Sequence, residues 1–138
     1  MNEPEVVIHL DGDRRVYWPG DVLSGEFHCE SLSLADPQSV ELSVMWYTDG
    51  QGDEDLGVHY FQRFARDDES AIDFRRPQRF STVLPNSPLS YDGVLIHLFW
   101  CVRVRMFLAR GKEGVAEQLF RLGHVPQVSL AALEEPLP

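Results

Sequence analysis

Apolar and polar residues alternate along most of this chain. From Val40 to Tyr47, the side chains of Val40, Leu42, Val44 and Trp46 fall on one face, with polar residues between them. A repeat of two residues predicts a β-strand that buries one of its faces. We therefore expect the chain to fold mainly as β-sheet.

The longest alternating segment runs from Val94 to Leu108. Every second residue in it is apolar, and the opposite side mixes apolar residues with His97, Arg103 and Arg105. This pattern predicts one long strand with a fully buried face and a mixed face.

The same alternation predicts other strands, separated by Gly, Pro and Asp residues that are typical of turns. The expected strands are Glu5–Leu10, Val22–Cys29, Val40–Tyr47, Leu56–Arg66, Arg79–Leu84, Val94–Leu108 and Glu117–Leu122. The segment from Lys112 to Phe120 also allows a short helix, which Gly114 disfavours. About seven to eight short strands predict an all-β fold, an immunoglobulin-like antiparallel β-sandwich.

The length of 138 residues fits one domain, which we expect over residues 1–125. Residues 126–138 are flanked by prolines and are expected to form a loosely held tail. The longest apolar run, Val94 to Val102, is less than half of the ~20 residues that a membrane helix needs. No signal peptide is expected at the N-terminus, and no membrane insertion is predicted.

The composition narrows the classes of partner and compartment. A net charge of −10 argues against nucleic acid or an anionic membrane as the main partner. The sequence has 2 cysteines, too few for a disulfide framework, and a cytoplasmic location is expected. Of the 12 basic residues, Lys112 is the only lysine, a bias that hints at a bacterial source.

Two segments are more specific than general β patterning. The first has Tyr17, Pro19, Gly20 and Asp21 before a strand, and Gly25 within it. Pro19 and Gly20 favour a turn into the strand, and Gly25 indicates a bulge or a close backbone approach. The second segment comprises Leu84, Pro85, Pro88, Ser90, Tyr91 and Gly93, followed by Trp100 in the long strand. All of these residues are expected to serve the architecture.

In order and separation, the two segments resemble the N-terminal domain of the arrestin-like superfamily, over about residues 5–122. That superfamily includes arrestin-related trafficking adaptors, the retromer cargo subunit and bacterial sporulation-control proteins. The resemblance implies a β-sandwich of the arrestin type and a role in protein binding. Typical members carry two such sandwiches, whereas this chain has room for one. The phosphate-pairing lysines and the P-P-x-Y motifs of some members are absent from this sequence.

No catalytic residue, metal site or cofactor is predicted. The histidines lie one per segment, without metal-binding spacing: His9, His28, His59, His97 and His124. Cys29 falls on an apolar face and Cys101 on the mixed face of the long strand, and neither is expected to be a reactive thiol. No nucleophile motif or Gly-rich phosphate loop occurs.

Two charged segments are candidate binding sites. The acidic loop from Asp49 to Asp55 has oxygen ligands that suit calcium, but not with the spacing of an EF-hand. We interpret it mainly as a solvated hairpin tip. The basic segment gathers Arg63, Arg66, Arg75, Arg76 and Arg79, interleaved with phenylalanines. Arginine can bind carboxylate or phosphate, although acidic residues at 67–69 and 73 can neutralise the cluster locally.

The sequence therefore favours a non-catalytic protein-interaction or scaffold module with a protein partner of unknown identity. Binding would use strand addition at a sheet edge, or a patch of aromatic and Arg side chains. A homodimer is a further expectation, since a lone sandwich leaves sheet edges unprotected. The alternative is a sandwich that binds calcium or a small ligand through the acidic loop.

Overall fold

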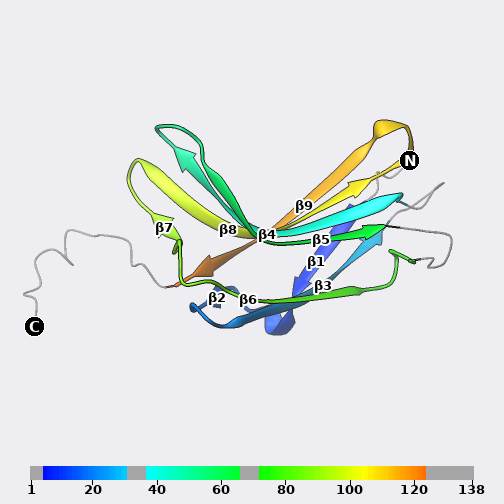
Figure 1. Cartoon of the computed structure of the whole chain (residues 1–138), viewed down its shortest axis with the longest axis horizontal. Helices are drawn as coiled ribbons and strands as arrows, with labels where there is room; N and C mark the ends of the chain where they lie inside the picture. Colours follow the sequence, from blue (N-terminus) through cyan, green and yellow to red (C-terminus); the bar gives the residue numbers. More distant parts are fainter. Residues whose placement is uncertain (1–4, 31–36, 66–71, 124–138) are drawn as a thin grey trace, which may run out of the picture.

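The computed structural model describes residues 5–30, 37–65 and 72–123, which form two β-sheets packed face to face (Figure 1). The smaller sheet has the order β1 (Glu5–Leu10), β3 (Val22–Glu30) and β6 (Gln78–Val83). The larger sheet has the order β2 (Val16–Tyr17), β9 (Glu113–Leu122), β8 (Ile96–Phe107), β4 (Ser39–Gly50) and β5 (Leu56–Ala65). A short strand, β7 (Tyr91–Asp92), pairs with β8. Two 3₁₀ turns, η1 (Asp11–Asp13) and η2 (Ala109–Gly111), complete the described elements.

The predicted all-β sandwich is confirmed. The sequence anticipated seven strands, and the described residues add β2 and β7, which are only 2 residues long each. Pairing is antiparallel except between β2 and β9, which run parallel. None of the described residues belongs to a helix that could span a membrane.

The core lies between the sheets and is built by the alternation that the sequence shows. On β4 and β8 it contains Val40, Leu42, Val44, Trp100, Val102, Val104 and Met106, and the smaller sheet contributes Leu10, Leu23, Phe27, Cys29 and Phe80. All of these side chains are buried. Burial of such side chains stabilises the fold by about 1.5–3 kcal/mol each.

Two of the expected strands have different limits in the structure. The segment from Lys112 to Phe120 is not helical, because β9 begins at Glu113 and pairs with β8 from Phe107 to Trp100. Val94 does not belong to the buried face of the long strand. Pairing with β4 ends at Ile96, and Val94 lies in a turn with 98% of its surface exposed.

Gly25 allows β1 and β3 to approach closely. A Cβ atom at this position would lie closer than 3.0 Å to the carbonyl oxygen of His9. The pairing of β3 with both neighbours is continuous, so there is no bulge at Gly25. Of the two alternatives that the sequence left open, the structure has the close backbone approach.

The two motif segments are bonded to each other. The Gly20 amide donates to the Leu84 carbonyl at 3.0 Å, and the Leu84 amide donates to the Asp21 carbonyl at 2.9 Å. The Asp21 carboxylate also accepts the Trp18 amide at 2.8 Å. Together these bonds join the turn before β3 to the end of β6.

The later part of the second segment is tied to β8 and β9. The Trp100 indole N–H donates to the Pro88 carbonyl at 2.7 Å. Ser90 is buried, and its hydroxyl oxygen accepts the Leu122 amide at 2.8 Å. The Ser90 amide donates back to the Leu122 carbonyl at 2.9 Å. These residues thus fix the connection between β6 and β8 against the larger sheet.

Candidate functional site

The predicted arginine cluster is divided between the two sheets. Arg63 is on β5 in register with Glu41, whose side of the larger sheet faces away from the core. Arg79 is on β6 in register with Glu26, on the outer side of the smaller sheet. The two arginines therefore point to opposite sides of the sandwich. Arg66 lies outside the described residues.

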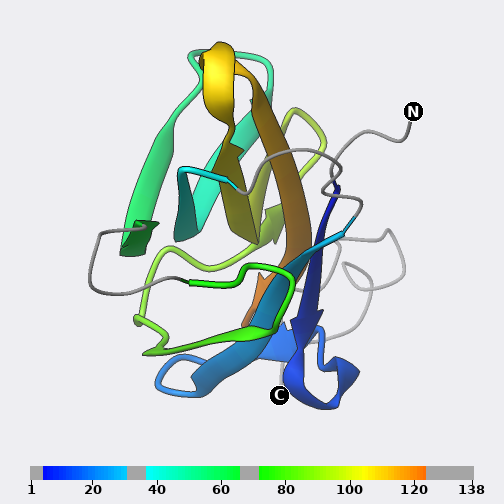
Figure 2. The ribbon, with the colours of Figure 1, turned by 90° about the vertical axis from the view of Figure 1, so that its right-hand side faces the viewer.

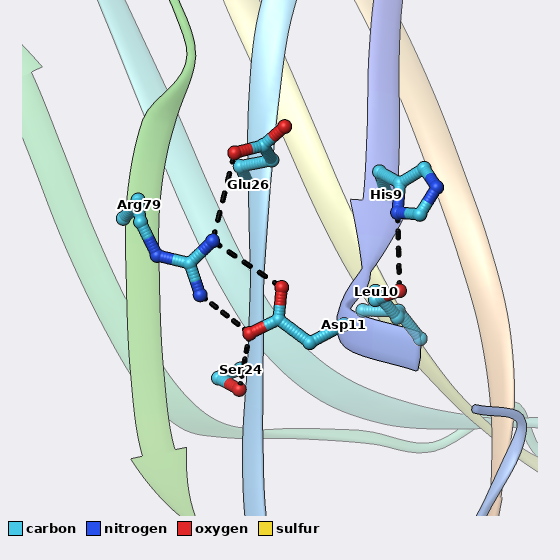
Figure 3. Close-up of polar contacts among 6 residues, drawn as sticks. All are labelled: His9, Leu10, Asp11, Ser24, Glu26 and Arg79. Atoms are coloured by element: carbon cyan, nitrogen blue, oxygen red, sulfur yellow. Dashed lines mark hydrogen bonds and ion pairs between the residues drawn. The ribbon is translucent and has the colours of Figure 1, made fainter. Parts of the chain in front are cut away.

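Arg79 is engaged by acidic side chains (Figure 3). Its guanidinium donates to both carboxylate oxygens of Asp11, at 3.2 Å for the Nη1–Oδ1 pair, and lies 3.5 Å from Glu26 Oε2. The Ser24 hydroxyl donates to the same Asp11 carboxylate at 2.7 Å. The hydrogen bonds from Arg79 and then from Ser24 hold the pKa of Asp11 below its usual value. This arrangement joins η1, β3 and β6, and it occupies Arg79.

Arg75 and Arg76 precede β6 in a turn organised by Asp73. The Arg75 amide donates to Asp73 Oδ1 at 3.1 Å, and Arg76 Nε lies 4.0 Å from Asp73 Oδ2. In contrast, Arg63 is exposed and forms no ion pair with any described residue. Among the described arginines of the predicted cluster, Arg63 is thus the candidate for binding a partner.

Exposed apolar side chains lie on the same strand as Arg63. Leu56, Val58 and Phe61 are exposed by 60%, 53% and 52%. Their partners on β4 are Tyr47, Met45 and Ser43, which all lie on the outer face. We refer to Leu56, Val58, Phe61 and Arg63 as the β5 outer row.

A β-bulge creates this row. The register between β4 and β5 shifts between Val44 and Met45, so that Val44 pairs with Tyr60 and Met45 pairs with Val58. His59 is left without a partner on β4, and its Nε2 lies 2.7 Å from the Val83 carbonyl oxygen. Because of the extra residue, Val58 and Phe61 share the outer face although they are three positions apart. The sequence period alone would place them on opposite faces.

The middle of this outer face is polar or buried, and exposed apolar side chains occur again on β9, where Val115 and Leu119 are exposed by 56% and 45%. Arg103 pairs with Glu117 at 2.5 Å and Arg105 pairs with Glu113 at 2.8 Å, across β8 and β9. Met45 and Cys101 point outward but are buried. A depression of about 390 Å³ lies at the start of β5, lined by Tyr47, Leu56 and Arg103 among others. Exposed apolar side chains on this face thus lie on β5 and on β9.

β5 is also the last strand of its sheet. Among the described residues it pairs with β4 alone, and no further backbone hydrogen bond reaches residues 57–65. Figure 2 shows β5, in green, at the outer margin of the larger sheet. An edge of this kind presents alternate N–H and C=O groups to an additional strand.

The acidic loop does not gather its carboxylates. No group of three or more His, Cys, Asp or Glu side chains within residues 5–30, 37–65 and 72–123 is arranged to hold a metal ion. The loop borders a small depression of about 220 Å³. Asp55 is used locally, since its Oδ1 accepts the Leu56 amide at 2.9 Å.

The described histidines each have a separate neighbour. His9 lies 3.3 Å from Asp13, His28 lies 2.9 Å from Glu30, and His97 lies 2.5 Å from Asp92. His124 lies outside the described residues.

Neither cysteine is placed to act as a nucleophile. Cys29 and Cys101 are both buried and free. Burial raises the pKa of Cys29 to about 11 and that of Cys101 to about 12. Both side chains therefore stay protonated thiols at neutral pH.

Comparison with known proteins shows that this chain has a fold similar to that of a solved structure. No family model matches this chain, and no curated protein matches it by sequence. Among solved structures, it is similar to Spo0M, a sporulation control protein from Bacillus subtilis, with a TM-score of 0.61 and 13% sequence identity. The likeness covers 91% of this chain and 51% of Spo0M, so the chain spans about half the length of that protein. The fold is therefore an arrestin-like β-sandwich.

Proposed function

We propose that this chain is a non-catalytic protein-interaction module of the arrestin-like type, which binds a protein partner through β5 and the adjoining outer face. We also propose that it acts in the cytoplasm of a bacterium. The arginine bias and the free cysteines support this setting. The fold by itself assigns no function.

The observation that carries the proposal is the β5 outer row. Three large apolar side chains stand exposed on the last strand of a sheet, next to an arginine without an ion pair among the described residues. Contiguous apolar surface that stays exposed in a folded protein commonly marks an interaction site. Strand addition would give main-chain hydrogen bonds, and the outer row would give selectivity.

Three of the described side chains that could act as nucleophiles, Cys29, Cys101 and Ser90, are buried in the fold. The cysteine thiols are buried and protonated, and the hydroxyl of Ser90 is held by the Leu122 amide. Catalysis by a nucleophile requires a reactive group beside a base. The burial of these three side chains therefore does not favour a nucleophilic role for them.

The test is affinity capture with the purified chain as bait, in an extract of its own source cells. We expect a partner, or further copies of the chain, to be recovered with the wild type and lost with Phe61→Asp. Val94→Asp is the matched control, because Val94 is an exposed apolar residue in the turn before β8. A wild-type bait that recovers neither would contradict the proposal, as would equal recovery with Phe61→Asp.

A further inference from the structure

The order of residues along β5 is self-complementary. The strand is preceded by Asp53, Glu54 and Asp55, which are exposed, and Arg63 lies near its end. Val58 and Phe61 stand on one face between these charged ends, on either side of the bulge at His59. If two copies of this strand lie side by side in antiparallel orientation, the acidic end of one copy lies beside the basic end of the other. Val58 of one copy then lies beside Phe61 of the other.

From this pattern we infer that β5 pairs in antiparallel orientation with β5 of a second copy of the chain. The inference rests on the proposed protein-binding role and names the partner and the surface. A two-fold axis would pass near His59 and Tyr60. Residues 56–58 of one copy would then bond to residues 61–63 of the other, and the two larger sheets would become continuous.

The side chains on the outer face fit this pairing. Val58 of each copy would lie opposite Phe61 of the other, which forms two pairs of an aromatic with a β-branched residue. Such cross-strand pairs are favourable in antiparallel sheets. Arg63 would lie opposite Leu56, within reach of the neighbouring carboxylates at 53–55. An exposed arginine without an ion pair among the described residues would thereby gain an acidic partner.

The bulge limits the hydrogen bonding in a way that can be measured. The irregularity falls between Val44 and Met45 on β4 and leaves His59 unpaired there. At the two-fold axis the bulges of both copies would meet. We therefore expect new amide protection on both sides of His59 and Tyr60, and little at these two residues.

The first test is the mass of the purified full chain by light scattering across a wide range of concentration. We expect reversible association to a dimer, twice the 15.8 kDa of one chain. Phe61→Asp and Arg63→Glu should each weaken association by about tenfold or more, and Val94→Asp should leave it unchanged. A charge exchange provides the sharper test, since Arg63→Glu combined with Glu54→Arg should restore the dimer.

The second test is hydrogen exchange of the wild type at dilute and concentrated conditions. Increased protection confined to residues 56–58 and 61–63 would support the inference. A dimer that leaves these amides unprotected, or that is broken by Val94→Asp rather than Phe61→Asp, would overturn it. A wild type that stays monomeric but captures a different protein, and loses it with Phe61→Asp, would overturn self-pairing and leave the proposed function standing.

Discussion

The substitution Ser90→Ala removes one buried hydrogen bond between the segment that precedes β7 and the end of β9. The Ser90 hydroxyl oxygen accepts the Leu122 amide at 2.8 Å, and only 2% of Ser90 is exposed. Alanine keeps the backbone bond from the Ser90 amide to the Leu122 carbonyl but leaves the Leu122 amide without this acceptor. An unpaired buried N–H costs about 1–3 kcal/mol in the free energy of unfolding.

Urea denaturation measures this loss. With a slope of about 2 kcal/mol per molar urea, a loss of about 2 kcal/mol lowers the midpoint by roughly 1 M. Ser81→Ala on β6 is the matched control, since Ser81 is exposed, and its effect should stay within about 0.5 kcal/mol. If Ser90→Ala unfolds at the same urea concentration as Ser81→Ala, the structural role assigned to Ser90 is refuted.

Four further predictions concern the smaller sheet, the thiols and the acidic loop. Gly25→Ala should destabilise the fold by about 1–3 kcal/mol in urea denaturation, because its Cβ would collide with the β1 backbone; an unchanged midpoint would contradict the close approach. Asp11→Asn should lower Tm at neutral pH. Because hydrogen bonds from Arg79 and Ser24 depress the pKa of Asp11, its contribution is present above the ordinary value of 3.8 and is lost as pH falls through the folded value. A Tm difference that persists unchanged in strong acid would oppose this assignment. Both cysteine thiols should react slowly with a disulfide reagent at pH 8 in the folded chain and rapidly in urea. The reason is that burial raises the pKa of Cys29 to about 11 and that of Cys101 to about 12. Fast labelling of the native protein would refute their burial. Millimolar calcium should leave Tm unchanged, because the described carboxylates do not converge; a clear rise in Tm would instead favour calcium binding by the acidic loop.

The alternation of apolar residues predicted the strands well because each strand has one face in a shared core. The limits of the strands depend on pairing, which the pattern does not contain. Val94 continues the apolar alternation but lies beyond the last pair between β8 and β4. The segment after Lys112 has a weak local pattern, and its pairing with β8 makes it a strand.

The candidate site could be predicted only in part. Arg63 and Arg79 are close in sequence, but β5 and β6 belong to different sheets, so proximity in the chain does not bring them together. The alignment of Val58 with Phe61 arises from a bulge, which breaks the period of two along β5. The sequence shows that β5 contains apolar residues. It does not show that β5 lies at a sheet edge or that these residues are exposed.

The central claim, that β5 is the contact between two copies, is tested most directly by a site-specific cross-link. The native thiols are buried and free, so a new exposed cysteine can be followed by itself. In the proposed pairing, Val58→Cys of one copy would lie opposite Phe61→Cys of the other, at a separation that a disulfide can span. We predict that mild oxidation of the two variants mixed together gives a cross-linked dimer in much higher yield than either variant alone. Equal yields from the mixture and from the separate variants, or no cross-link in the mixture, would contradict the account.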